Sequence, residues 1–217
     1  MRETDDRCRL VLILPPADDI GKQAQQLEEA LGAGDVATVI LPQYGRDDQQ
    51  FQIAAEHIVP IAQAHGAAAL IAGDSRTAGR SKADGLHFEG SIEDLRDTLA
   101  KHTPKMIVGA GGASERHKAL EIGEAQPDYI FFGKVEGDIK PEPHPKNLAL
   151  AEWWASMVEI PCIVMGGNEV ASVVAAAETG AEFVALRLAV FEHPEGPAAA
   201  IATANALLDE KAPRFNA

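Results

Sequence analysis

The chain has 217 residues, of which 46% are hydrophobic and 24% charged, and its formal net charge is −14. Such a composition is typical of an ordinary globular protein. Binding to a phosphate backbone needs clustered Lys and Arg, and the chain has no basic run, which argues against a nucleic-acid partner. No stretch approaches the roughly 20 apolar residues of a membrane span, and the first residues lack the apolar segment of a signal peptide. We therefore expect a cytoplasmic protein without a membrane partner.

Eight short aliphatic runs occur along the chain, and each ends in a glycine, proline or polar turn before a helix-like stretch. They cover residues 9–14, 35–41, 68–72, 84–88, 105–109, 128–133, 161–167 and 182–188. Strands that alternate with helices build parallel sheets, and eight such units close a barrel. We predict an α/β fold, a (β/α)8 TIM barrel that forms a single domain over residues 1–217. Its chemistry should lie on the loops that follow the strands.

Helical periodicity fills most of the gaps between these strands. A helix over 18–31 should begin at Asp18 or Asp19 as a cap and end at Gly32. A second over 47–65 contains Pro60, which should kink or split it. Ser91 should cap a helix over 91–101. The other predicted helices cover residues 113–125, 147–158, 168–179 and 197–208.

The gap between the third and fourth strands is the weak point of this scheme. Only residues 75–82 separate them, which is too short for a full crossover helix. A small barrel with one shortened crossover explains the gap. An open, doubly wound sheet is the alternative.

The sequence Ile160-Pro-Cys-Ile-Val-Met-Gly-Gly-Asn168 carries the strongest signal for a ligand. An apolar strand leads into Gly166 and Gly167 and then into a helix that Asn168 should cap. Glycines let a ligand approach the backbone, and helix amides attract anions. Barrels commonly hold phosphate on the loops after the seventh and eighth strands. The two glycines therefore predict a phosphate site, with a tight turn that binds nothing as the alternative.

A long loop rich in proline and charge follows the sixth strand. Gly133 and Lys134 open it, and residues 136–146 also include Lys140 and Lys146. Loops of this length are usually lids or binding loops, and a lysine on such a loop can close over a diphosphate. Solvated lysines are the alternative.

Charged residues also occur at the third strand. Asp74 follows it, and a carboxylate at this end of a barrel can bind Mg²⁺ together with phosphate oxygens. Arg76 and Arg80 follow closely. They either neutralise phosphate charge or pair with Asp74 at the surface.

Other reactive side chains lie in or beside strands. His87 should point into the barrel or towards its top, as a catalyst or a core group, and Glu89 follows on the same face. Arg187 lies in the apolar eighth strand. An unpaired buried charge is very costly, so Arg187 needs a phosphate or a partner such as Glu89. Cys8 and Cys162 give neither a disulfide framework nor metal-ligand spacing, and we expect buried, inert thiols.

Four blocks of sequence resemble the thiamine phosphate synthase and TenI family. They are Ala83-Asp-Gly-Leu-His-Phe88, Pro127-Asp-Tyr-Ile-Phe-Phe-Gly133, Ile160-Pro-Cys-Ile-Val-Met-Gly-Gly167 and Thr179-Gly-Ala-Glu-Phe-Val-Ala185. The resemblance implies a (β/α)8 barrel that joins a pyrimidine diphosphate to a thiazole phosphate, with Mg²⁺ assisting the loss of diphosphate. It implies that Gly166 and Gly167 hold the thiazole phosphate. Asp74 would bind Mg²⁺, and Lys140 would meet the diphosphate.

The chain departs from this family around the diphosphate. The family's Gln-Leu-Arg-x-Lys is replaced by Leu41-Pro-Gln-Tyr-Gly45, its Asn-Asp pair by Gly73-Asp74, and its Leu-Gly-Gln-x-Asp by Phe88-Glu-Gly-Ser-Ile92. A serine is lost within Gly109-Ala-Gly-Gly112, and a Thr-rich loop has become Glu136-Gly-Asp-Ile139. The glycines on the phosphate side survive better than the donors on the diphosphate side.

Two functions fit this pattern. The first is thiamine phosphate synthesis from small phosphorylated substrates, with Lys140 and His87 as catalytic residues. The alternative is a family member without synthase activity. That protein would be either a TenI-like thiazole tautomer isomerase with His87 as general base, or a module that binds a phosphorylated thiazole without turnover. Dimers are common among such barrels, and a homodimer is the corresponding expectation. The residues expected to contact substrate are Gly133, Lys134, Gly166, Gly167, Arg187, Arg76 and Glu89.

Overall fold

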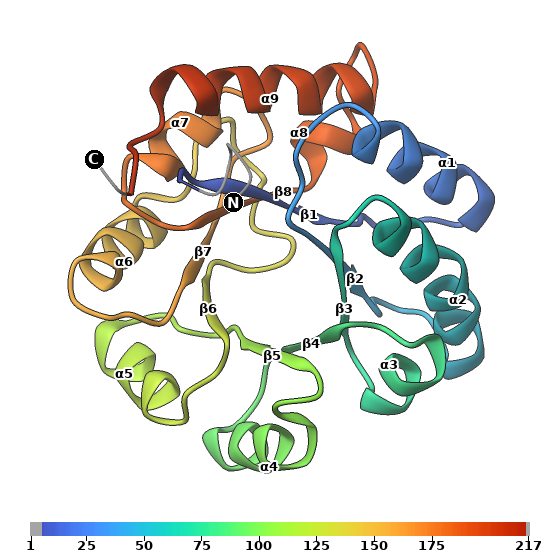
Figure 1. Cartoon of the computed structure of the whole chain (residues 1–217), viewed down its shortest axis with the longest axis horizontal. Helices are drawn as coiled ribbons and strands as arrows, with labels where there is room; N and C mark the ends of the chain where they lie inside the picture. The colour runs from blue at the N-terminus through green and yellow to red at the C-terminus, as the bar shows by residue number, and fades with distance from the viewer. Residues whose placement is uncertain (1–5, 216–217) are drawn as a thin grey trace.

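Residues 6–215 are described by the computed structural model, and they form a closed barrel of eight parallel strands (Figure 1). The strands are β1 (Arg9–Ile13), β2 (Thr38–Pro42), β3 (Ala68–Ala72), β4 (Gly85–Phe88), β5 (Ile107–Ala110), β6 (Tyr129–Phe132), β7 (Cys162–Met165) and β8 (Phe183–Leu186). Neighbours in the chain pair with each other, and β8 pairs back onto β1 with Arg9 opposite Phe183. The predicted (β/α)8 barrel is confirmed, and the alternative of an open sheet is wrong.

Helices surround the barrel, as Figure 1 shows. They are α1 (Ile20–Leu31), α2 (Asp48–Ala64), α3 (Ser75–Ser81), α4 (Ile92–His102), α5 (Arg116–Glu124), α6 (Pro145–Ala155), α7 (Ser172–Ala177), α8 (Leu188–Phe191) and α9 (Pro197–Lys211). The predicted caps of two helices are confirmed, because Asp19 accepts the Lys22 N–H at 3.0 Å and Ser91 accepts the Asp94 N–H at 3.1 Å.

Two helices differ from the prediction: α3 is present although none was expected, and α2 continues through its proline. The gap between β3 and β4 does hold a helix, α3, which Asp74 caps by accepting the Arg76 N–H at 3.2 Å. Pro60 does not split α2. It lies on the exposed side of the helix, where water can satisfy the carbonyl that a proline leaves without a donor.

The segments after β7 and β8 also differ from the prediction. Asn168 does not cap a helix, because α7 begins only at Ser172. The Asn168 N–H instead donates to the Lys140 carbonyl at 2.8 Å. Directly after β8, where no helix was predicted, Arg187 is followed by the short helix α8.

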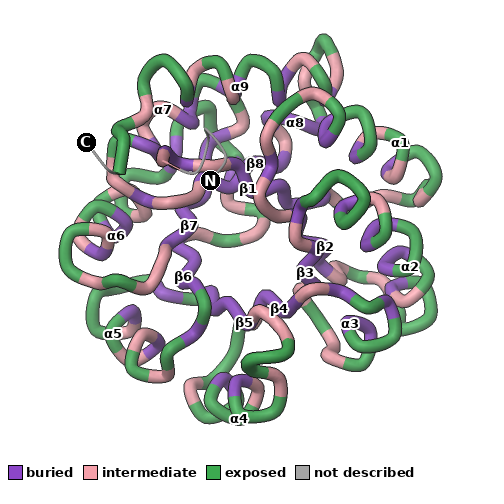
Figure 2. Tube along the Cα trace, viewed as in Figure 1, coloured by how far each residue is buried: buried purple, intermediate pink, exposed green. Residues whose placement is uncertain are grey.

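The interior of the barrel is a packed core and not a pore. A compact apolar cluster fills it, contributed by Val11, Ile13, Ile40, Leu70, Tyr129, Phe131, Ile163, Met165 and Ala185. The outward side chains of the strands pack against the helices in a larger cluster, and Figure 2 shows the buried strands at the centre. A substrate therefore has room only at the mouth of the barrel.

The first and last described residues lie together beside the β1–β8 seam (Figure 1). Arg7 is 1% exposed and donates to Asp209 of α9 at 2.7 Å. The Phe215 N–H donates to the Asp6 carbonyl at 2.7 Å. The two ends of the described part of the chain are thus joined by hydrogen bonds.

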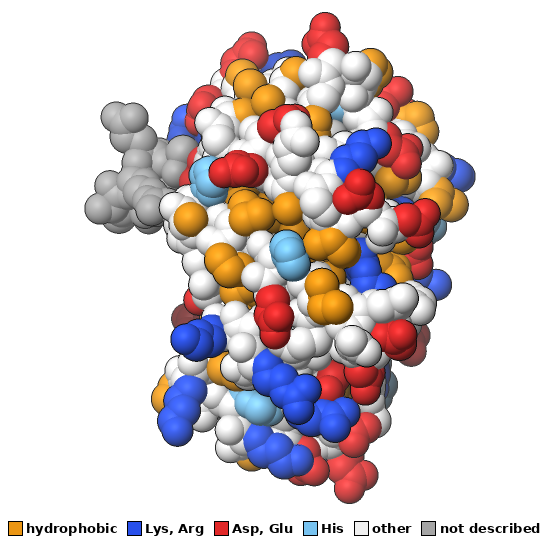
Figure 3. Space-filling model, turned by 90° about the vertical axis from the view of Figure 1, so that its right-hand side faces the viewer, with side chains coloured by type: hydrophobic (Ala, Val, Ile, Leu, Met, Phe, Trp, Pro, Cys, Tyr) orange, Lys and Arg blue, Asp and Glu red, His pale blue; other side chains and the backbone are white. Residues whose placement is uncertain are grey.

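The outer surface gives little information about partners. Within residues 6–215 no helix is long and apolar enough to cross a membrane. On the side that carries α1 to α3, several basic side chains gather in the lower part of the view, while acidic ones are spread over the rest of the face (Figure 3). That no nucleic acid binds stays a prediction.

Candidate active site at the barrel mouth

The predicted site residues gather at one end of the barrel. Because all strands are parallel, their carboxyl ends face the same side, and Asp74, Glu89, Gly133, Gly167 and Arg187 each follow such an end. The structure nevertheless divides these residues into separate groups, which are described in turn.

Arg187 at the end of β8 is bound by a carboxylate from the long loop. Its Nε and Nη2 atoms donate to Asp138 Oδ1 at 2.9 and 2.7 Å, and the Leu188 N–H donates to Asp138 Oδ2 at 2.7 Å. The Asp138 side chain is completely buried and that of Arg187 is 6% exposed. The prediction that Glu89 pairs with Arg187 is wrong, since Glu89 lies against His87.

The same loop covers the paired glycines after β7. An added Cβ on Gly167 would fall 1.9 Å from the Pro141 carbonyl oxygen. The Gly167 N–H donates to Ser172 Oγ at 3.0 Å, and the Asn168 N–H is bound by Lys140 as described above. The glycines thus permit close packing of the loop, and the described structure has protein acceptors on the amides that were predicted to hold phosphate.

The lysines of the loop are exposed to solvent. Lys134 follows Gly133, where an added Cβ would fall 2.5 Å from Met165 Cβ. The Lys134 carbonyl accepts the Gly137 N–H at 2.9 Å. The backbone of Lys140 is held at the glycine turn, because its carbonyl accepts the Asn168 N–H.

His87 points into the barrel beneath the mouth. Its side chain is 1% exposed, and its Nε2 atom lies 3.6 Å from Glu89 Oε1. Within the described residues that nitrogen has no hydrogen-bond partner. The imidazole also packs edge-on against Phe131 at 5.3 Å between centroids. Glu89 is about half exposed, so it stands between His87 and the solvent.

Asp74 is paired with an arginine. Its Oδ2 atom accepts Arg76 Nε at 2.8 Å, and Arg76 Nη2 lies 3.9 Å from Asp48. Burial would raise the pKa of the Asp74 carboxyl, but the hydrogen bonds and charge of Arg76 outweigh it and lower that pKa. Surface pairing, one of the two alternatives for Arg76, is what the structure contains.

The guanidinium of Arg76 lies where a cation would meet two carboxylates. Among residues 6–215 no group of three or more His, Cys, Asp and Glu side chains could hold a metal. Mg²⁺ needs fewer, because it is usually held by one or two carboxylates together with substrate phosphates and water. Asp74 and Asp48, which both face the Arg76 guanidinium, are two carboxylates of this kind.

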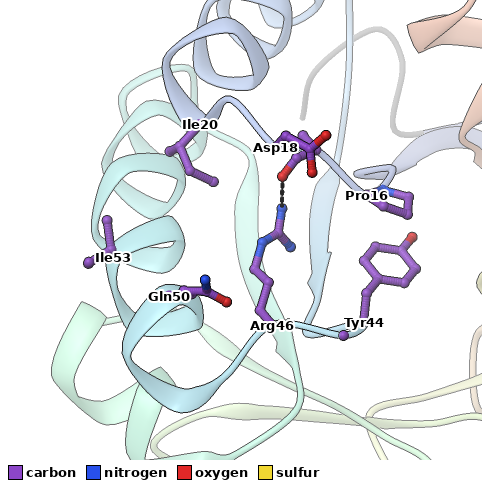
Figure 4. A pocket seen from close by; sticks show the side chains of 9 residues that line it. Pro16, Asp18, Ile20, Tyr44, Arg46, Gln50 and Ile53 are labelled. Carbon is purple, nitrogen blue, oxygen red and sulfur yellow. Dashed lines mark hydrogen bonds between the residues drawn. The ribbon is translucent and has the colours of Figure 1, made fainter.

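A cavity of about 420 Å³ opens between the loops after β1 and β2 (Figure 4). Tyr44 and Arg46 line it. The Arg46 guanidinium donates only to neutral oxygens, those of Pro42, Ala17 and Gln23, at 3.3 to 3.4 Å. Burial lowers the pKa of Arg46. Within residues 6–215 its guanidinium makes no ion pair with a carboxylate.

Tyr44 connects this cavity to Arg187. Its hydroxyl donates to the Leu14 carbonyl at 2.8 Å. Burial raises the pKa of Tyr44 to about 12, although the neighbouring Arg187 guanidinium acts in the opposite direction. The cavity and the Arg187 group are therefore adjacent parts of one mouth.

The thiols are buried and free. Burial raises the pKa of Cys8 to about 12 and raises that of Cys162 as well. Both thiols are therefore neutral at physiological pH, which agrees with the expected inert role.

Sequence reasoning missed Asp138, Tyr44, Arg46 and Tyr129. A signal existed for Asp138, because a buried arginine needs an anion and the long loop offers acidic residues within the Glu136-Gly-Asp-Ile139 run. Arg46 also had a signal, because it directly follows the Leu41-Pro-Gln-Tyr-Gly45 stretch that replaces the family's Gln-Leu-Arg-x-Lys, whereas Tyr44 and Tyr129 had none. Their positions depend on how the loops after β1 and β2 pack together and on which strands lie opposite each other in the barrel.

Comparison with known proteins decides the family. The model of the family described as thiamine monophosphate synthase matches residues 10–190. This protein belongs to the thiamine monophosphate synthase family. The resemblance seen in four blocks of sequence is thereby confirmed.

Members of this family match the chain over nearly its full length. The thiamine-phosphate synthase of Rhodospirillum centenum is 36% identical over 204 residues, which cover 93% of this chain and 98% of that protein. The thiamine-phosphate synthase of Hyphomonas neptunium is 34% identical, with 95% and 96% coverage. The structure of thiamine phosphate pyrophosphorylase from Pyrococcus furiosus superposes with a TM-score of 0.77 at 17% identity, over 95% of this chain and 98% of that one. It shares the fold.

Proposed function

We propose that this protein is a thiamine phosphate synthase. The likeness to thiamine-phosphate synthases over more than nine-tenths of both chains carries the proposal. In the reaction the bond between the pyrimidine methylene carbon and the diphosphate oxygen breaks, and diphosphate leaves with the electron pair. The lone pair of the thiazole nitrogen then forms the new carbon–nitrogen bond.

The thiazole phosphate would bind at the ends of β7 and β8. Arg187 supplies a guanidinium, Leu188 an amide, and Gly166 and Gly167 a backbone that a ligand can approach. Arginine suits this task because its planar donors match a phosphate as they match a carboxylate. The Asp138–Arg187 contact supports the assignment by its chemistry, since it already places an anion on these donors.

The pyrimidine diphosphate would bind on the opposite side of Tyr44, in the cavity beside Arg46. Arg76, Lys134 and Lys140 can add positive charge at its rim. Mg²⁺ would be held by Asp74 and Asp48 with the diphosphate oxygens, and when bound it neutralises the charge of the leaving group. The protein itself mainly positions the substrates and stabilises charge, above the apolar floor formed by Phe131 and Met165.

The test is product formation by the purified protein. We expect thiamine phosphate, detected by mass spectrometry, when both substrates and Mg²⁺ are present. Lys140→Ala should lower the rate by about 10²-fold, as for the loss of one charge-stabilising donor, because its backbone contact with Asn168 is kept. Lys101→Ala in the last turn of α4, at the other end of the barrel, is the matched control. Absence of product from the wild type would contradict the proposal.

One observation favours the alternative of binding without turnover. On the diphosphate side, Asp74 is occupied by Arg76 and β2 ends in Pro42, which has no side-chain donor. Calorimetric titration separates the two functions. A non-synthase would bind thiazole phosphate and show no Mg²⁺-dependent affinity for the pyrimidine diphosphate. If such a protein isomerises the thiazole, His87 is the general base, reached after Glu89 moves aside.

Two expectations from the sequence are part of the proposal. A homodimer is expected, and size-exclusion chromatography with light scattering tests it. A cytoplasmic location likewise stays a prediction, which fractionation of cells that express the chain tests.

A further inference from the structure

Arg187 faces more negative charge than its single positive charge can balance. Besides Asp138, it has Glu136 Oε1 at 3.6 Å from its Nη1 atom. Two carboxylates therefore face one guanidinium, and their combined charge equals that of a phosphate dianion. Asp138 accepts three hydrogen bonds, two from Arg187 and one from the Leu188 amide. This is the donor pattern that an anion-binding site offers to a bound oxyanion.

The loop that carries Asp138 is held by polar contacts around that residue and by apolar contacts near its two ends, where Val135 packs against the interior cluster and Pro143 is buried. In Figure 1 the yellow segment after β6 crosses the mouth towards β8 and β1 before it returns to α6. Its other attachments are the Lys140 carbonyl on the Asn168 amide and the Pro141 carbonyl over Gly167. Ile139, beside Asp138, is 74% exposed, so this apolar side chain does not anchor the loop. Between Val135 and Pro143 the loop is therefore attached chiefly through the Arg187 and Leu188 donors on Asp138, which a phosphate could bind equally well.

We propose that Asp138 is a built-in competitor of the substrate phosphate and a determinant of specificity for it. The carboxylate occupies the anion site at the ends of β7 and β8, and a phosphate dianion displaces it together with residues 136–142. The inference rests on the proposed function only in identifying the natural ligand as the thiazole phosphate. The site and its occupant come from the contacts of Asp138.

Specificity follows from this competition. A ligand binds with its intrinsic affinity reduced by the fraction of molecules whose site is free. A phosphate dianion brings two charges and several acceptor oxygens, and it can replace both Asp138 and Glu136. The thiazole alcohol without phosphate brings neither, so it cannot open the loop. Asp138 thus excludes the unphosphorylated molecule.

The first test measures binding of inorganic phosphate and of thiazole phosphate by calorimetry. Asp138→Asn keeps the size of the side chain and removes its charge, and it should lower the dissociation constant for both ligands about ten-fold. Glu142→Gln removes one charge from an exposed position on the same loop and should change neither constant by more than about two-fold. If Asp138→Asn binds phosphate no better than the wild type, Asp138 is a support for Arg187 and the proposal is wrong.

The second test uses the wild-type chain and so does not depend on a variant that folds. Saturating inorganic phosphate should increase hydrogen–deuterium exchange in peptides that cover residues 136–142 and leave α4 unchanged. Exchange that stays the same or slows in that loop overturns the proposal. Both readouts are independent of thiamine phosphate formation. A protein that makes no product and still shows them would refute the proposed function while supporting this inference.

Discussion

His87 and Tyr129 share a 2.7 Å hydrogen bond across the interior of the barrel, from β4 to β6. The bond joins the His87 Nδ1 atom to the tyrosine hydroxyl. Burial raises the pKa of Tyr129 far above its usual range, so the phenol stays protonated and can donate. The pair therefore fixes the imidazole with its Nε2 atom turned towards Glu89 and the mouth.

Tyr129→Phe should destabilise the protein by about 1–3 kcal/mol, because it leaves the buried Nδ1 atom of His87 without a partner. Urea unfolding at neutral pH measures this. The double variant His87→Phe/Tyr129→Phe should lose less than the sum of the two single variants, since both remove the same bond. Additive losses would show that the hydrogen bond has no energetic role.

Two glycines should respond in opposite ways to an added methyl group. A Cβ on Gly109 in β5 would fall 1.9 Å from the Tyr129 ring, so Gly109→Ala should cost about 1–3 kcal/mol or more through overpacking. A Cβ on Gly79 in α3 meets nothing within 4 Å. Gly79→Ala should therefore stabilise the protein by about 0.4–1 kcal/mol. Thermal unfolding of both variants compares them, and an equal response would contradict the packing described at β5.

Asp74 should make stability depend on pH. Its folded-state pKa is depressed by Arg76, so its contribution is present above the unfolded-state pKa of about 3.9 and is lost as the pH falls through the lower folded-state value. Asp74→Asn, which can still cap α3, should be less stable than the wild type at neutral pH. The difference in urea midpoint should narrow towards about pH 3.

The control for this experiment is Asp97→Asn, which removes the same charge from an exposed position on α4. Its midpoint should follow the wild type throughout. A gap between Asp74→Asn and the wild type that stays constant with pH would rule out the ion pair as its source.

The thiols should react only after unfolding. Because burial raises the pKa of Cys8 to about 12 and raises that of Cys162, neither supplies thiolate at about pH 8, where a free cysteine partly ionises. A disulfide exchange reagent should release no colour from the folded protein and two equivalents in denaturant, matching the two cysteines of the chain. Rapid reaction of the folded protein would be incompatible with this packing.

The barrel was predictable because each strand can be identified from a short stretch of the sequence. Strands of a parallel sheet that is covered on both sides are almost continuously apolar, and β7 is an example with all four residues buried. Glycine, proline and polar turns mark their ends. The seven-residue helix α3 was missed because the judgement rested on length. Asp74, which caps it, was interpreted as a metal ligand or an ion-pair partner and not as a cap.

The contact of the long loop with Arg187 at the mouth was not predictable in the same way. Asp138 and Arg187 are 49 residues apart, and a proline-rich loop has no periodicity from which its path can be deduced. The glycines after β7 were identified as a place of close approach. What approaches them in this structure is the backbone of Pro141, and that follows only from the three-dimensional path of the loop.

Hydrogen bonds join Asp6 to Phe215 and Arg7 to Asp209. The barrel is therefore closed by contacts between its first and last units, and not by a continuous backbone between them. A covalent linker from Phe215 back to Asp6 would add a peptide connection where a hydrogen bond already exists. The barrel could then be opened at an exposed turn far from the mouth, as in a circular permutation, and every strand would keep its two neighbours.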